Sequence, residues 1–366
     1  MAAAAGASRD GQTALALRLA KHLAPGGGAD DASAAAAAGN VAFSPVSVHA
    51  ALALVAAGAR GATQAQLLAF LGAPSAKALA AFGRRVAERV LADRSDSAGG
   101  PRVLFGGGVW VDASRGGITD AFRDVAAESY KSDARTVNFT KKPAEAVKTI
   151  NEWVKKATDN LIDTIISTSD INAATDLVLA NAVYFKGKWM DPFDPLSTKP
   201  GAFHRLDGSI SEAEFMTTGI RWLDVACMDG FKVLKLPYKP GLWRKGTPSP
   251  DAVEETQYSM FVFLPDARDG ISTMVDVVTA APAFLYGILA EMKNKPVHIK
   301  LPKFSISFNW NGLGPNLRRL GLSLPFSAEA GDLQGMCVED DVAGSRRPTF
   351  LSKVVLEFAQ DHLLRN

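Results

Sequence analysis

The clearest pattern in the chain is a run of almost wholly apolar residues from Leu177 to Phe185, followed by the turn signal Lys186-Gly187. β-Branched and aromatic side chains dominate the run and occupy both alternating faces. A strand with two apolar faces is covered on both sides, so we predict a central strand of a large sheet, with a buried helix turn as the alternative. Asn181 interrupts the run, and a buried amide needs hydrogen-bond partners, so we expect it to tie neighbouring elements together.

The N-terminal region predicts a helix and a loop. The spacing of Leu15, Leu19 and Leu23 is typical of one face of a helix. We expect residues 1–11 to be a frayed terminus rather than a secretory signal, because they lack the order of basic and apolar residues that a signal requires. The alanine and glycine tract at 26–39 predicts a flexible surface loop.

A serine-proline pair opens the next helix. Ser44 is a good N-cap and Pro45 fits the first helical position. The helix to about Ala57 is apolar nearly all round and should be buried. Before it, residues 41–43 predict a short strand, and a second helix opens at Gly61. From the residues alone, the simplest role for Ser44 is helix capping.

The helical spacing of three to four residues and the alternation typical of strands predict further elements. Helices are predicted at 76–93, 147–161, 272–292 and 313–320, and strands at 103–112, 231–238, 258–265 and 297–307, the last broken at Pro302. Three glycines at 106–108 lie inside a strand pattern without the spacing of a phosphate-binding loop, so we expect a bulge or a close backbone approach there. The proline- and glycine-rich stretch 239–257 predicts a surface loop.

Composition narrows the possible functions. The chain has 366 residues, 47% apolar and 21% charged, which is ordinary for a globular protein of one large domain or two smaller ones. A formal net charge of +2 is too weak a bias to predict a nucleic-acid or membrane partner. No run approaches the length of a membrane span.

The residue types that carry chemistry form no recognisable site. Neither H-E-x-x-H nor G-x-S-x-G occurs, although spacing alone does not rule out a triad whose members meet in the fold. Cys227 and Cys337 have no metal-ligand spacing, and two reduced thiols are expected rather than a disulfide. We therefore expect no enzyme, no metal and no cofactor.

The run 181–189 resembles the signature strand of the serpin family, most closely its plant branch. Other segments resemble landmarks of the family in the expected order, among them 150–154, 301–304, 320–322 and 324–327. The resemblance covers roughly residues 12–358. It implies an α+β serpin fold over 1–366 as a single domain, with a large mixed main sheet, smaller second and third sheets, and eight or nine helices.

The resemblance also implies site residues. Ser44, Ser47 and Asn181 match the polar cluster called the shutter, which governs opening of the main sheet in the family. Trp189 matches the tryptophan at the top of that sheet. Ser352 stands where the family usually has the shutter histidine.

The sequence departs from the family after Phe358. There the family shows an acidic-glycine turn and a run of small residues, the hinge, which leads into the reactive loop. Residues 359–366 read as a divergent tail without these features. We expect a C-terminally truncated serpin that lacks the hinge, the reactive loop with its scissile bond, and the last strands of the smaller sheets.

Three functions remain open on this basis. Serpins inhibit when a protease cleaves the loop and the loop inserts into the main sheet as a new strand. The first hypothesis is a non-inhibitory serpin. The second is an inhibitor of serine or cysteine endopeptidases, which requires a longer C-terminal end. The third is a binding or scaffold protein that uses 239–257 or a sheet edge. We expect a monomer in the cytoplasm, or outside the cell by analogy with the family.

Overall fold

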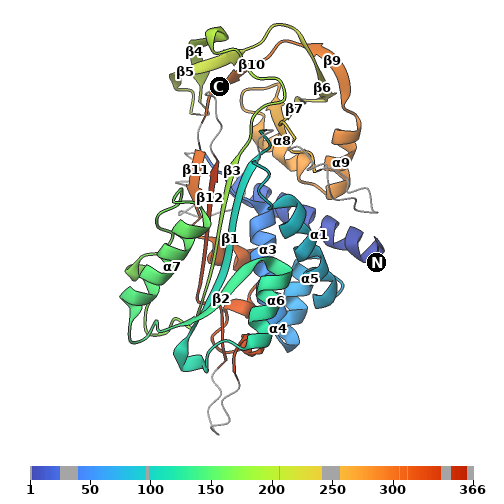
Figure 1. The fold of residues 1–366 in the computed structure, drawn as a ribbon. Coiled ribbons are helices and arrows are strands. Elements are labelled where there is room, and N and C mark those ends of the chain that lie inside the picture. The colour runs from blue at the N-terminus through green and yellow to red at the C-terminus, as the bar shows by residue number, and fades with distance from the viewer. Residues whose placement is uncertain are drawn as a thin grey trace, which may run out of the picture.

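The computed structural model describes residues 2–24, 40–95, 99–205, 207–240, 256–304, 306–310, 312–338 and 348–360. A five-stranded main sheet runs along the long axis of the molecule, and two smaller sheets lie beyond one end of it (Figure 1). Nine α-helices in these ranges surround the sheets. The predicted α+β class, with a mixed main sheet and two smaller sheets, is confirmed.

The main sheet has the strand order β11-β12-β3-β1-β2. Its central strand β3 is antiparallel to β1 and parallel to β12. Nearly every residue of β3 is buried, so the predicted central strand is confirmed and the helical alternative is wrong. The bounds are β1 Arg102–Asp112, β2 Ser132–Val137, β3 Leu177–Lys186, β11 Ile306–Asn309 and β12 Lys353–Gln360.

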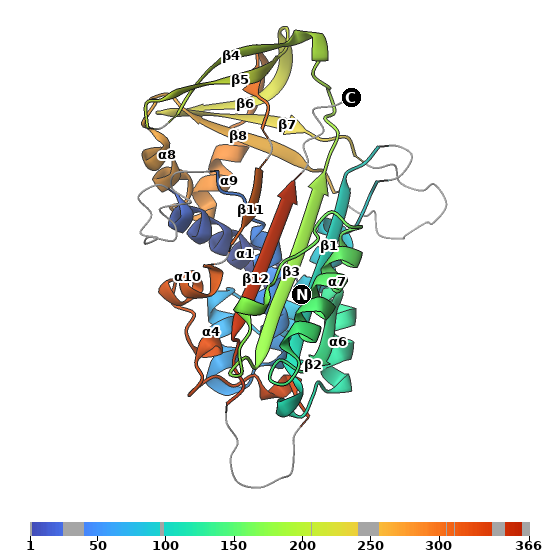
Figure 2. The same cartoon turned by 90° about the vertical axis from the view of Figure 1, so that its left-hand side faces the viewer.

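Helices cover both faces of the main sheet. On one face α3 lies directly against the strands, supported by the other N-terminal helices, while α7 crosses the opposite face (Figure 2). Under α7, Trp110 and Trp153 meet edge to face with ring centroids 4.7 Å apart. The helices are α1 Ala2–Leu23, α3 Pro45–Gly58, α4 Gly61–Phe70, α5 Ala76–Arg85, α6 Asp120–Tyr130, α7 Pro143–Ala157 and α10 Leu313–Arg319.

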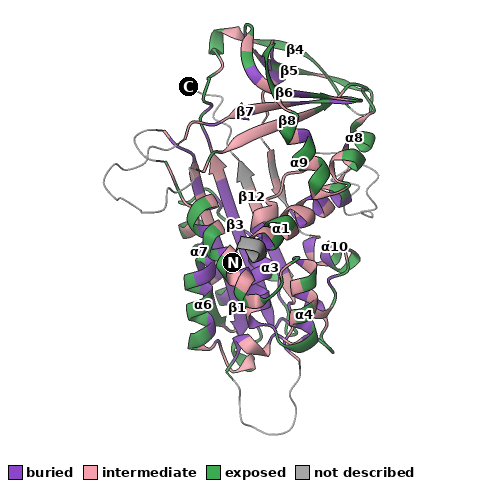
Figure 3. Cartoon of the chain, turned by 90° about the vertical axis from the view of Figure 1, so that its right-hand side faces the viewer, coloured by how far each residue is buried: buried purple, intermediate pink, exposed green. Residues whose placement is uncertain are grey.

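The smaller sheets are less deeply buried than the main sheet (Figure 3). One has the order β10-β5-β4 and the other β8-β7-β6-β9, with α8 and α9 beside the latter. Their elements are β4 Thr198–His204, β5 Ile210–Thr217, β6 Arg221–Met228, β7 Phe231–Pro237, β8 Ser259–Pro265, α8 Ile271–Val278, α9 Pro282–Ala290, β9 Lys293–Val297 and β10 Lys300–Pro302.

Several predicted boundaries are wrong. The first helix begins at Ala2, so residues 2–11 are helical rather than frayed, because alanine has the highest helix propensity. Residues 41–43 form no strand. The single helix predicted at 272–292 is two helices, because Pro282 cannot donate the hydrogen bond that would continue the first one. The loop predicted at 26–39 and most of 239–257 lie outside the described residues.

The three glycines of β1 allow close packing rather than a bulge. Pairing between β1 and β3 continues without interruption through residues 106–108. A Cβ atom on Gly107 would lie 2.3 Å from the hydroxyl of Ser132 in β2, and one on Gly106 would lie 2.7 Å from Ala157 in α7. Close backbone approach, one of the two predicted explanations, is therefore correct.

Among the described residues no single helix has the length and apolar character of a membrane span, although the sharply bent pair α8 and α9 meets those two criteria together.

Candidate functional site

Asn181 connects the main sheet to the helix beneath it. Its side chain is 1% exposed. The hydroxyl of Ser47 donates to Asn181 Oδ1 at 3.0 Å, and Asn181 Nδ2 donates to the carbonyl of Ser47 at 3.3 Å. Two hydrogen bonds thus join α3 to the centre of β3, so Asn181 ties neighbouring elements together as expected from a buried amide.

Ser44 completes the cluster from the start of α3. Its hydroxyl accepts the backbone N–H of Ser47 at 3.2 Å, which satisfies one of the free donors of the helix terminus. The structure therefore brings Ser44, Ser47 and Asn181 together, the first as a helix cap and the other two as a bonded pair. Their role in opening the sheet stays a prediction.

The cluster lies beneath the place where two parallel strands meet. Strand β12 pairs with β3 from Lys353 opposite Val178 to Gln360 opposite Phe185, and we call this pairing the β3–β12 seam. Leu356 is the residue opposite Asn181. The hydrogen bonds of Asn181 consequently hold one side of the seam against α3.

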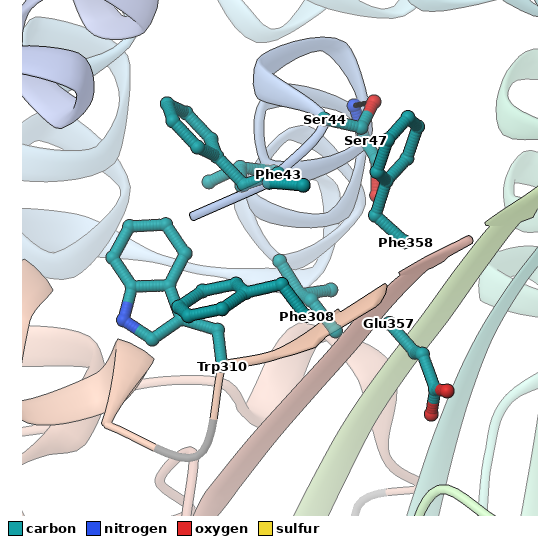
Figure 4. A pocket seen from close by; sticks show the side chains of 10 residues that line it. Phe43, Ser44, Ser47, Phe308, Trp310, Glu357 and Phe358 are labelled. Atoms are coloured by element: carbon teal, nitrogen blue, oxygen red, sulfur yellow. Dashed lines mark hydrogen bonds between the residues drawn. The ribbon is translucent and has the colours of Figure 1, made fainter. Parts of the chain in front are cut away.

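A small, mostly apolar pocket opens beside the cluster (Figure 4). Phe43 and Trp310 meet there edge to face, with centroids 5.5 Å apart. Glu357 points away from these rings, and burial raises the pKa of its carboxyl group. The lining residues come from the start of α3 and from the β11 and β12 strands: Ala42, Phe43, Ser44, Ser47, Val48, Phe308, Trp310, Leu356, Glu357 and Phe358.

Ser352 lies at the base of the seam rather than in the cluster. Its hydroxyl accepts the N–H of Asp176 at 2.9 Å, and its own N–H donates to the carbonyl of Leu177 at 3.0 Å. Asn181 faces Leu356, which lies further along β12. Ser352 thus anchors the start of β12, and the residue of β12 opposite Asn181 is Leu356 rather than the serine expected to take the place of the shutter histidine.

An ion pair that the sequence analysis did not predict lies at the same end of the β3–β12 seam. Lys353 Nζ lies 2.6 Å from Asp170 Oδ1, and both side chains are about one quarter exposed. Burial alone would raise the pKa of Asp170, but hydrogen bonds from Lys353 and Ser167 outweigh it and lower that pKa. The partners are 183 positions apart, so no local pattern could have revealed them.

Comparison with known proteins decides the family. The family model described as "Serpin (serine protease inhibitor)" matches residues 10–359. The chain belongs to the serpin family. Serpin-ZXA of Oryza sativa subsp. japonica is 44% identical over 324 residues, covering 87% of this chain and 76% of that protein. Serpin-Z1B of Triticum aestivum is 42% identical over 319 residues, covering 87% of this chain and 75% of the relative. The predicted likeness to the plant branch is confirmed.

Solved serpin structures share the fold. The structure of Arabidopsis AtSerpin1 in its native stressed conformation gives a TM-score of 0.82 at 33% identity, covering 96% of this chain and 82% of that one. Native protease nexin-1 with heparin gives 0.80 at 21% identity, and that likeness concerns the fold alone.

In this serpin Trp189 joins the main sheet to the four-stranded sheet. Its ring stacks on Tyr238 at a centroid distance of 4.4 Å, and the two residues form an isolated β-bridge. Beside it, Arg221 donates to the carbonyl groups of Asp191 and Pro192. Trp189 therefore lies where the chain after β3 meets the end of β7.

The serpin offers little other chemistry in its described residues. No group of three or more metal-ligating side chains occurs within those ranges. Both cysteines are free, with Cys227 exposed and Cys337 buried. Burial raises the pKa of the Cys337 thiol to about 11, which keeps the thiol protonated and unreactive at neutral pH.

Proposed function

We propose that this 366-residue chain is a serpin that does not trap proteases. The observation that carries the proposal is the identity of residues 359–366, Ala-Gln-Asp-His-Leu-Leu-Arg-Asn. An inserting hinge needs small side chains, because it must enter a narrow gap between strands. Histidine, leucine and arginine are too bulky for that gap, and no acidic-glycine turn precedes them.

The β3–β12 seam explains why a hinge is needed for trapping. A strand inserted between β3 and β12 would run antiparallel to both and would replace a parallel pairing with two antiparallel ones. Antiparallel pairing is slightly more stable per residue, so insertion would lower the free energy of the sheet. If residues 359–366 take the place of the hinge, their bulky side chains would keep the seam closed and this free energy would not be released.

We further propose that Ser44, Ser47 and Asn181 hold the seam closed, in the role that the family assigns to its shutter. Separation of β3 from β12 would move Asn181 relative to α3 and strain its two bonds to Ser47. The cluster would therefore act as a barrier to opening rather than as a binding or catalytic site.

Incubation with proteases tests the proposal. The purified chain is mixed with trypsin-like, chymotrypsin-like and papain-like proteases, and covalent complexes are sought on a denaturing gel. We expect degradation without a complex and without slowing of the protease. Each protease blocked by a small active-site inhibitor serves as the control for non-covalent or unrelated bands.

A stable covalent band would contradict the proposal. It would point to a substitute bait loop, and 239–257 would be the first segment to delete. Loss of the band in that deletion variant would locate the loop, whereas its persistence would direct the search to other exposed segments.

A second candidate is a serine or cysteine endopeptidase inhibitor, in a form that carries a hinge and a reactive loop. The parallel seam favours it, because a strand inserted there would gain two antiparallel pairings. Grafting the hinge and loop of the Arabidopsis relative after Phe358 tests this candidate. A covalent complex with a protease would show that the scaffold is competent to inhibit, and cleavage without a complex would count against it.

A further inference from the structure

The sequence contains one N-glycosylation sequon, Asn138-Phe139-Thr140. Such a motif accepts an N-linked glycan when a chain enters the secretory pathway, and it normally lies in an exposed surface loop. Here it occupies the short turn between β2, which ends at Val137, and α7, which begins at Pro143. Because the sequence contains no second sequon, any N-glycan on the chain reports on this site.

The middle residue of the sequon belongs to the core. Phe139 is 1% exposed and packs in the cluster between α7 and the main sheet. Trp110 of β1 and Ile150 of α7 belong to the same cluster. Moving the sequon into an enzyme would therefore pull an aromatic ring out of a close-packed site, which a surface loop does not require.

A buried carboxylate fixes the backbone of the sequon. Asp112, the last residue of β1, accepts the N–H groups of Phe139 at 2.6 Å and Thr140 at 3.1 Å on its Oδ2. The Thr140 hydroxyl lies 3.5 Å from its Oδ1. Burial alone would raise the pKa of Asp112, but hydrogen bonds from Ser114, Thr140 and Phe139 outweigh it and lower that pKa. The carboxylate is therefore ionised at neutral pH, and its hydrogen bonds are charge-assisted.

The acceptor asparagine is also engaged. Asn138 Oδ1 accepts the N–H of Lys141 at 2.7 Å, and the Asn138 carbonyl accepts the N–H of Lys142 at 3.1 Å. Glycosylation requires the asparagine amide and the hydroxyl two residues later to reach the enzyme together. In the folded protein both groups belong to this fixed turn, so the turn must open before the glycan is transferred.

We propose that Asn138 is an N-glycan acceptor controlled by folding, which accepts a glycan before the turn closes on Asp112 and is excluded afterwards. The transfer joins Asn138 Nδ2 to C1 of the first sugar of a lipid-linked oligosaccharide. The bond from C1 to the lipid pyrophosphate breaks, and the amide loses a proton. This inference goes beyond the proposed function, because it concerns neither the seam nor a protease.

The order of synthesis makes folding and glycosylation compete. Asp112 precedes the sequon, and the helix that covers Phe139 ends at Ala157. At roughly 5–20 residues per second, the end of α7 follows the sequon within about 1–3 s. The period in which the turn is open is therefore short, and we expect a glycan on only part of the chains.

Cell-free translation with microsomes, using the full chain behind a cleavable secretory signal, measures the glycosylated fraction as an endoglycosidase-sensitive band. We expect a glycan on fewer than about half of the wild-type chains, and on none of the Asn138→Gln chains. Asp112→Ala should raise the fraction about twofold or more, because the turn stays open for longer. Asp112→Asn replaces one accepting oxygen with an amide NH2 group that donates, so it should raise the fraction even if the alanine variant does not fold.

Asn316→Ala is the matched control. Asn316 is buried in α10, and its Oδ1 lies 3.0 Å from His22 Nε2, so the substitution weakens a buried contact in another part of the protein. It should leave the glycosylated fraction at the wild-type value, because α10 is made long after the sequon. Nearly complete glycosylation of the wild type, no increase in either Asp112 variant, or an equal increase in Asn316→Ala would overturn the proposal.

Discussion

At the scale of single residues, the hydrogen bonds of Asn181 connect the centre of the main sheet with α3. The side chain lies among apolar neighbours and is 1% exposed, so its polar atoms depend on Ser47. A buried polar group that loses its partner costs about 1–3 kcal/mol. The stability of this contact can therefore be measured by deleting one side of it.

Asn181→Ala should lower the free energy of unfolding by about 2 kcal/mol, because Ser47 is left with unpaired buried groups. Chemical denaturation measures the change. The double variant with Ser47→Ala should cost less than the sum of the two single variants, since both remove the same bonds. Asn294→Ala, at an exposed position, is the control and should change stability by less than about 0.5 kcal/mol. Additive single effects would show that the pair is not coupled.

His49 should make the free energy of unfolding depend on pH in the acid range. It is buried in α3, packs edge to face on Phe82, and its ring is hydrogen-bonded to the backbone of Leu71. Burial lowers its pKa from 6.5 to about 4, and the bond to Leu71 opposes that shift only in part. The unfolded chain therefore binds a proton on this residue at a higher pH than the folded chain does.

Stability should fall as the pH drops from 6.5 toward 4, with about 3 kcal/mol of the loss due to His49. Above pH 6.5 its contribution is fully present, because the ring is neutral in both states. Denaturation curves at several pH values should show a shallower slope for His49→Gln. His298→Gln, on an exposed histidine, should keep the original slope. Equal slopes for all three proteins would contradict the assignment.

At the scale of elements, β12 is fastened at its first residue. The Lys353–Asp170 pair joins the strand to the turn before β3, and the Ser352 hydroxyl accepts from Asp176 beside it. Both contacts lie at the same end of the seam. Opening of the seam should therefore be easier from the end at Gln360 than from the end at Lys353.

Lys353→Met should speed amide hydrogen exchange in the first half of β12 and lower stability by about 1 kcal/mol, because Asp170 loses its partner in a partly buried site. Exchange followed by mass spectrometry resolves that segment. Lys148→Met removes an exposed i,i+4 pair with Glu152 and is the control, with an expected change below about 0.5 kcal/mol. The same exchange rates in β12 of both variants would show that the pair does not fasten the strand.

The elements that could be predicted from sequence are those with a local signal. The apolar run around Asn181 identified β3, and the serine-proline pair identified the start of α3. The position of Ser352 and the pairing of Lys353 with Asp170 depend on the register between distant strands, which no local pattern records. Pro282 is a local signal for a break between two helices, but the apolar residues on both sides of it favour one continuous helix.

At the scale of the whole molecule, burial is uneven. Most residues of β1 and β3 are buried, whereas the residues of β4 and β8 are half-buried or exposed. Local opening takes less free energy where few apolar contacts hold a segment. The two ends of the molecule should therefore differ in how often they open.

Native-state hydrogen exchange should show the slowest amides in β1 and β3 and faster exchange in β4 and β8. Within the wild-type chain, β7 is an internal reference, because it belongs to the same sheet as β8 but contains buried Phe231, Val233 and Leu236. Slow exchange in β8 at low protein concentration would contradict this order.

The order of strands in the main sheet also determines when each strand finds its neighbours during synthesis. Strand β12 is the last described element in the sequence, yet it lies between β11 and β3 in the sheet. A ribosome makes roughly 5–20 residues per second, so β3 is synthesised many seconds before its neighbour at 353–360. Throughout that delay the side of β3 that will face β12 has no partner strand, while its other side can pair with β1. The nascent chain therefore passes through a period in which the centre of its main sheet is exposed to other chains on the side that β12 later covers.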